Sequence, residues 1–123
     1  MHWFSVALGG AIGALCRYWV SSSLMPVTQY KFPCVTVSVN VAGSLLVGIL
    51  YVLIVEKGGL PEQARNLLMV GFLGAFTTFS TFSLDALSLW QNGDQFLALA
   101  YVVSTVVLCL LAIIGAVWLT RLF

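Results

Sequence analysis

The chain has 123 residues, of which 61% are hydrophobic and only 7% are charged, and its formal net charge is +1. A soluble domain carries about 25% charged residues, so this composition predicts one integral membrane domain, residues 1–123, with the lipid bilayer as its solvent. The small net charge excludes nucleic acid and any acidic partner held by bulk charge.

The first predicted membrane helix covers residues 2–22, and we interpret it as a retained span. The glycines and alanines of residues 9–14 form overlapping small-xxx-small pairs, which let another helix approach backbone to backbone. Arg17 lies near the far end of this span. Because a buried arginine is costly, its side chain either reaches the interface or faces a watery interior, and the sequence leaves both open. Two prolines in residues 25–33 predict a loop there.

The second predicted span, residues 34–55, has no charged residue but contains Asn40. A primary amide in hydrocarbon needs hydrogen-bond partners, and it usually finds them across a helix interface. Asn40 therefore either holds the bundle together or offers an amide donor to a polar permeant. Residues 56–62 carry two glycines and a proline and are expected to form a turn.

The third predicted span, residues 62–90, contains the most unusual stretch of the chain. Residues 71–83 combine two glycines, four phenylalanines and five hydroxyl side chains. On a continuous helix the four phenylalanines would lie within an arc of roughly 120°, with Thr77, Thr78 and Thr81 on the opposite side. The glycines and threonines also weaken the helix, which predicts a break near residues 74–78. Non-helical backbone at that depth must be buried in protein or line a cavity or ion site.

The fourth predicted span, residues 95–120, follows a turn at residues 92–94. Tyr101 and Thr105 are four residues apart and share a helix face with Cys109. The three cysteines of the chain are widely spaced and odd in number, which predicts neither a disulfide framework nor a metal motif.

Four spans with short connections place both termini on one side of the membrane. Three basic residues, at positions 57, 65 and 121, then lie on that side, and two, at positions 17 and 31, lie on the other. This bias is almost absent by the standard of the positive-inside rule, so the chain is expected to insert in both orientations. Dual insertion would permit an antiparallel homodimer.

The sequence contains no catalytic constellation, so we expect no enzyme. The single histidine, His2, stands at the terminus, and the many serines and threonines have no base beside them. Neutral hydroxyl and amide donors with few acids suit an anion better than a cation, because cation pores are usually ringed by carboxylates. The positive edge of a phenyl ring is also favourable for an anion.

Three motifs resemble the Fluc (CrcB) family of fluoride channels. Residues 74–83, Gly-Ala-Phe-Thr-Thr-Phe-Ser-Thr-Phe-Ser, look like that family's third-helix motif. Residues 9–18 resemble its glycine-rich first helix ending in arginine, and residues 39–43 resemble its second-helix asparagine motif. The length of the chain and its four spans match the family throughout.

The resemblance implies a passive, fluoride-selective channel that releases fluoride from the cytoplasm and so relieves its toxicity. It implies a dual-topology homodimer in the cell inner membrane, with two antiparallel pores. Phe79 and Phe82 would bind fluoride by their ring edges, Asn40 would be the amide donor, and Arg17 would add positive potential at a vestibule. The fluoride pathway implied in this way comprises Arg17, Asn40, Phe79, Ser80, Thr81, Phe82, Tyr101 and Thr105.

The resemblance also implies a structural Na⁺ at the dimer interface. The backbone carbonyls of Gly74 and Thr77 from both subunits would be its ligands. This role agrees with the predicted break, because carbonyls freed from a helix are natural ligands for a hard cation.

Two other functions stay open at this point. A small dual-topology proton-coupled exporter of cationic compounds needs a membrane-embedded carboxylate, and the first three spans offer none before Asp85, which we expect near an interface. In a non-transporting membrane subunit, by contrast, the polar residues would serve only helix association.

Overall fold

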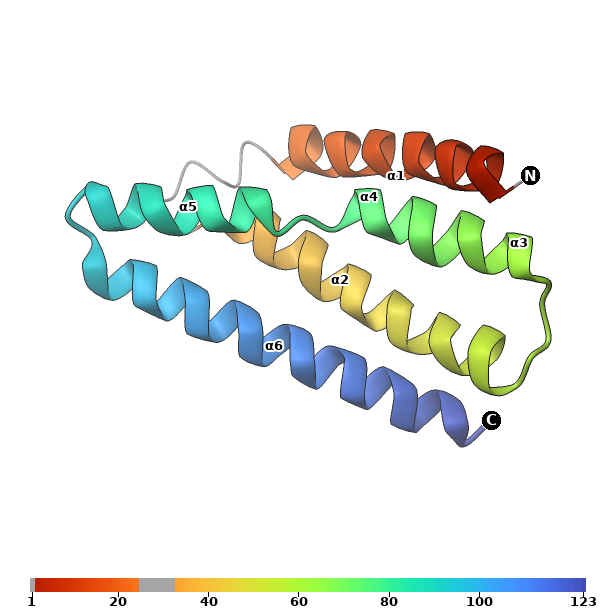
Figure 1. The fold of residues 1–123 in the computed structure, drawn as a ribbon. Coiled ribbons are helices and arrows are strands. Elements are labelled where there is room, and N and C mark those ends of the chain that lie inside the picture. The colour runs from red at the N-terminus through yellow and green to blue at the C-terminus, as the bar shows by residue number, and fades with distance from the viewer. Residues whose placement is uncertain (1, 25–32) are drawn as a thin grey trace.

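The computed structural model describes residues 2–24 and 33–123, and within these ranges it contains helices and turns but no strand (Figure 1). Two of its segments, η2 and η3, are wound as π-helix and continue their neighbouring α-helices. The elements in chain order are α1 (His2–Leu24), α2 (Cys34–Leu50), η2 (Tyr51–Glu56), α3 (Glu62–Arg65), η3 (Asn66–Leu73), α4 (Gly74–Phe76), α5 (Ser80–Gln91) and α6 (Gln95–Arg121).

The prediction of an all-α protein with four membrane-spanning helices is confirmed. Among the described residues, four helical runs are long and apolar enough to cross a bilayer, and each of their bounds lies within one residue of the expected span. These runs are His2–Ser23, Cys34–Glu56, Glu62–Gln91 and Gln95–Arg121. The predicted loop at residues 25–33 lies outside the described residues except for its last position.

The start of α1, the start of α3 and the end of α6 lie at one end of the bundle, and the turn between α5 and α6 lies at the other (Figure 1). Gly93, in that turn, has a φ of 87°, which a residue with a side chain rarely adopts. At the first end, the Arg121 guanidinium donates to Glu56 through Nε at 2.9 Å and through a terminal nitrogen at 2.5 Å. This ion pair joins the end of α6 to the end of η2.

The two halves of the third span pack against different partners. The first half, η3 and α4, lies along α1, whereas the second half, α5, packs on α6. Buried side chains gather accordingly in two clusters, one around Leu73 and Phe76 and one around Phe82 and Tyr101. The break near the middle of this span therefore lets one membrane segment serve two interfaces.

The small residues of α1 hold it against η3 at backbone distance, as the sequence predicts. A Cβ atom built on Gly9 would overlap the Leu67 carbonyl oxygen, and one built on Gly13 would overlap the Phe72 carbonyl oxygen. Within η3, a Cβ on Gly71 would lie 2.7 Å from the Val6 carbonyl oxygen. The interface is therefore formed by backbone atoms, and any side chain there would push the two helices apart.

Replacing Gly13 with alanine is expected to lower the free energy of unfolding in detergent by about 1–3 kcal/mol, the usual cost of overpacking a close contact. The matched control is Gly115→Ala, since a Cβ at Gly115 meets nothing within 4 Å. The control should be neutral or stabilising by up to about 1 kcal/mol, because alanine is the better helix former. Equal stability of the two variants would contradict the backbone contact.

Candidate functional site

The third span opens at Thr77, where the backbone is extended with φ −83° and ψ 157°. The Leu73 carbonyl oxygen accepts both the Thr77 N–H at 3.0 Å and the Thr77 hydroxyl at 2.8 Å. The helix α4 ends at these two hydrogen bonds to one carbonyl oxygen, and the next helix, α5, begins only at Ser80. The predicted break near residues 74–78 is thereby confirmed.

The non-helical backbone of Thr78 forms hydrogen bonds with the side chain of Asn40, from α2. The Thr78 N–H donates to Asn40 Oδ1 at 2.9 Å, and Asn40 Nδ2 donates to the Thr78 carbonyl oxygen at 3.0 Å. In a continuous helix the same N–H would donate to the Gly74 carbonyl four residues earlier. The asparagine thus replaces a helical bond and uses one of its two amide hydrogens to do so.

The Thr78 side chain is hydrogen-bonded to the first turn of α5. Its hydroxyl oxygen accepts the Thr81 N–H at 3.2 Å and donates to Thr81 Oγ1 at 3.2 Å. In a continuous helix the Thr81 N–H would donate to the Thr77 carbonyl. The two carbonyls predicted to bind a cation, those of Gly74 and Thr77, therefore both lose their usual helical donors to side-chain oxygens.

A cavity of about 390 Å³, which we call the phenylalanine cavity, lies on one side of the break. Its polar lining consists of amide, hydroxyl and thiol groups, and no charged residue in the described part of the chain lines it. Phe79 is 77% exposed, whereas Phe82 is 7% exposed, and their ring centroids lie 5.4 Å apart at an angle of 55°. The lining residues with polar or aromatic side chains are Asn40, Ser44, Thr77, Thr78, Phe79, Phe82, Thr105 and Cys109.

The Thr105 hydroxyl is the one buried side-chain polar atom that has no hydrogen-bond partner among the described residues. The residue is only 4% exposed, and it lines the phenylalanine cavity one helical turn from Cys109. A buried hydroxyl without a partner is costly, so this position favours a polar occupant of the cavity.

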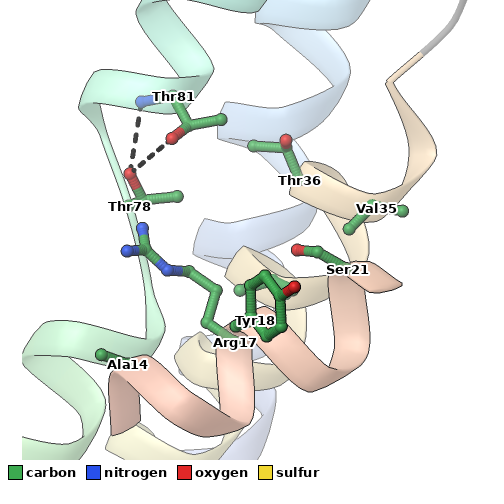
Figure 2. A pocket seen from close by; sticks show the side chains of 9 residues that line it. Ala14, Arg17, Tyr18, Ser21, Val35, Thr36, Thr78 and Thr81 are labelled. Atoms are coloured by element: carbon green, nitrogen blue, oxygen red, sulfur yellow. Dashed lines mark hydrogen bonds between the residues drawn. The ribbon is translucent and has the colours of Figure 1, made fainter. Parts of the chain in front are cut away.

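A second cavity, the arginine cavity, measures about 230 Å³ and lies between α1, α2 and the start of α5. Figure 2 shows the Arg17 side chain extending toward the threonines at the break. Arg17 thus lines a cavity between helices. Within residues 2–24 and 33–123 no carboxylate pairs with it. The polar residues that line this cavity are Arg17, Tyr18, Ser21, Thr36, Thr78 and Thr81.

Asp85 is a polar centre to which sequence reasoning assigns no role in the channel. Thr36 donates to its Oδ2 atom at 2.8 Å and Tyr101 donates to the same atom at 3.2 Å. The Asp85 carboxylate, on α5, thus accepts hydrogen bonds from both α2 and α6. The signal was available, since a lone acid in an apolar span requires donors from neighbouring helices.

The predicted separation of rings and threonines on one continuous helix is wrong. The extended residue Thr77 turns the second half of the span relative to the first, so the phenylalanines form two separate pairs. The Phe72 and Phe76 rings stack at 5.8 Å in the first half, away from the Phe79 and Phe82 pair. Thr77 lines the same cavity as the latter pair, although the arc placed it opposite.

The remaining predicted site residues are distributed around this geometry. Tyr101 is fully buried beneath Phe82, with ring centroids 5.1 Å apart, and lines neither cavity. Ser80 is exposed, and its hydroxyl lies 3.4 Å from that of Thr78. Thr81 faces the arginine cavity and Thr105 faces the phenylalanine cavity, while Thr78 lines both. The structure thus divides the predicted pathway into two compartments that share one residue.

Known proteins match this chain over almost its whole length. Residues 4–117 match the family model described as CrcB-like protein, Camphor Resistance (CrcB). A protein of Saccharophagus degradans named fluoride-specific ion channel FluC is 56% identical over 97% of this chain and 89% of its own length. A protein of Hahella chejuensis with the same name is 51% identical over 98% and 95% of the two chains. The chain is therefore a multi-pass membrane protein that belongs to the CrcB-like family.

Proposed function

We propose that this chain forms a fluoride-selective channel in the cell inner membrane, through which fluoride leaves the cytoplasm passively and its toxicity is relieved. The relatives that bear the name fluoride-specific ion channel support the proposal at 51–56% identity. The main structural support for the proposal is the phenylalanine cavity, whose described lining includes phenyl rings, an amide and hydroxyl groups but no charged side chain. A passive channel of this kind catalyses no reaction.

Fluoride suits this lining for electrostatic reasons. The edge of a phenyl ring is positive, and the tilted Phe79 and Phe82 rings offer edges rather than one stacked face. Asn40 keeps a second amide hydrogen after bonding Thr78, and the unpartnered Thr105 hydroxyl can donate as well. Several weak, neutral donors allow an anion both to enter and to leave, which conduction requires.

The arginine cavity supplies the entrance in this proposal. The guanidinium of Arg17, which has no carboxylate partner within residues 2–24 and 33–123, would raise the local concentration of anions, and the hydroxyls of Thr78 and Thr81 line the same cavity. Thr78 lines both cavities, so an anion in the arginine cavity would be separated from the phenylalanine cavity only by this residue. Ser80, Thr81 and Tyr101 extend the polar surroundings of this passage.

We also propose that the working unit is an antiparallel homodimer. The sequence has three basic residues on the side of the termini and two on the other side. This bias is almost absent by the standard of the positive-inside rule, which supports insertion in both orientations. Exposed aromatic residues such as Phe79 would find neighbours in the second copy.

Na⁺ fits the break through the chemistry of its oxygen atoms. The N–H groups that would pair with the Gly74 and Thr77 carbonyls donate instead to Asn40 Oδ1 and Thr78 Oγ1. Free carbonyls at an unwound membrane helix are suited to binding Na⁺. We propose that these carbonyls, from both subunits, would hold a structural Na⁺ at the dimer interface, where its charge would supply a fixed link between the two breaks.

Neither alternative function gains support from the structure. An exporter of cationic compounds needs a carboxylate that exchanges protons for substrate. Asp85 accepts hydrogen bonds from Thr36 and Tyr101 inside the bundle and lines neither cavity. A subunit without transport activity would have no use for the unpartnered Thr105 hydroxyl in a cavity.

Purified protein in liposomes is expected to release trapped fluoride within seconds once a potassium ionophore sets a driving voltage. A fluoride electrode follows the release, and a chloride electrode on matched vesicles should record none. Release of both ions from the proteoliposomes, or of neither, would contradict the proposed function. Proton-driven export of a lipophilic cation that is lost on Asp85→Asn would favour the exporter instead.

Replacing Phe79 or Phe82 with isoleucine removes a ring edge but keeps an apolar side chain of similar bulk. Each variant is expected to lower the fluoride release rate by at least about tenfold, the effect of losing roughly 1.4 kcal/mol of favourable interaction. Gel filtration should show the dimer intact. Trp118→Ile is the control, because Trp118 is 62% exposed on α6 and lines neither cavity. Undiminished release from both phenylalanine variants would refute the ring-edge role.

Exchanging Na⁺ for a larger monovalent cation on both sides is expected to inactivate the channels slowly, because the replacement does not fit the carbonyl site. The rate and direction of fluoride release should not depend on an imposed Na⁺ gradient. Liposome flux measured with and without such a gradient tests both statements. If the gradient drives fluoride uphill, the protein is a coupled carrier and the cation is not structural.

A further inference from the structure

Gly43 lies on α2 almost one turn after Asn40, and it faces the break in the third span. A Cβ atom built on Gly43 would overlap Cγ2 of Thr77 and would lie 3.6 Å from the Thr77 Cβ atom and 3.7 Å from a Phe76 ring carbon. Gly43 is buried and lines the phenylalanine cavity together with Thr77. Because Gly43 has no side chain, the Thr77 methyl group can occupy the space that a Cβ atom would take.

Thr77 cannot easily turn its methyl group away from this space. Its hydroxyl donates to the Leu73 carbonyl oxygen at 2.8 Å, and this bond to the residue four positions earlier fixes χ1. The same residue has the extended backbone that opens the helix. A side chain that displaces the Thr77 methyl group would therefore either break the hydrogen bond from its hydroxyl to Leu73 or shift the Thr77 backbone.

We propose that Gly43 is a positioning residue for the break, which sets the backbone of Thr77 through the rotamer of its side chain. Asn40 bonds the backbone of Thr78 from the same helix. The two residues act together, because Asn40 holds the opened backbone while Gly43 leaves room for the threonine that precedes it. The inference rests on the proposed channel and names a residue that acts on the Thr77 carbonyl without contacting fluoride.

The first variant to test is Gly43→Ala in the full-length protein. We expect fluoride release to fall by about tenfold, within the range of coupling measured for residues in direct contact. The Na⁺ concentration that keeps half of the channels active should rise several-fold, because a displaced Thr77 carbonyl binds the cation less well. Gly115→Ala, which adds the same methyl group to a membrane helix where nothing lies within 4 Å, should leave both quantities unchanged.

The decisive variant is the pair Gly43→Ala with Thr77→Ser. Serine keeps the hydroxyl that bonds Leu73 and lacks the methyl group that the new Cβ would overlap. The Gly43 substitution should therefore cost little fluoride release when it is compared with Thr77→Ser alone. The same coupling is expected in the free energy of unfolding in detergent, which serves as the readout if Gly43→Ala folds poorly or Thr77→Ser conducts little.

The outcomes separate this inference from the proposal on which it rests. Absence of fluoride release from the unaltered chain refutes the channel. Release that is equal in the unaltered chain and in Gly43→Ala refutes the positioning role alone. An equal loss from Gly43→Ala with and without Thr77→Ser, in both flux and stability, also overturns it, because the methyl group would then be irrelevant.

Discussion

The reciprocal hydrogen bonds between the Asn40 side chain and the Thr78 backbone are the interaction on which the rest of the structure depends. A backbone N–H or carbonyl without a partner costs several kcal/mol in hydrocarbon, which is why membrane segments are normally continuous helices. One amide offers both a donor and an acceptor, so it can replace both missing partners at once. The position of Asn40 on α2 therefore determines where the third span can open.

Opening the third span at this point organises both packing and chemistry. The first half of the span follows α1, the second follows α6, and a cavity forms on each side of the residues between them. One cavity is lined by Arg17, and the described residues that line the other are all uncharged. In the proposed channel, attraction of an anion and its selection would take place in adjacent but chemically different cavities, because Thr78 lines both.

The four spans, the break and the glycine face of α1 could be predicted because each depends on composition or spacing within one segment. The partners of Asn40 and Asp85 could not, since an amide or a carboxylate demands donors and acceptors without specifying which helix supplies them. The orientation of Thr77 was mispredicted because helical periodicity fails across an extended residue. The division of the site into two cavities depends on three helices together, so no single motif contains it.

The contact between α1 and η3 bears on how this sequence can change. Backbone atoms at Gly9 and Gly13 form the contact, while most of the remaining α1 side chains, such as Trp3, Leu15 and Trp19, are largely exposed. Exposed positions in a bilayer require only an apolar residue, because lipid does not distinguish one hydrocarbon side chain from another. Exposed α1 positions that face lipid thus require only an apolar residue, whereas the positions of Gly9 and Gly13 have no room for a side chain.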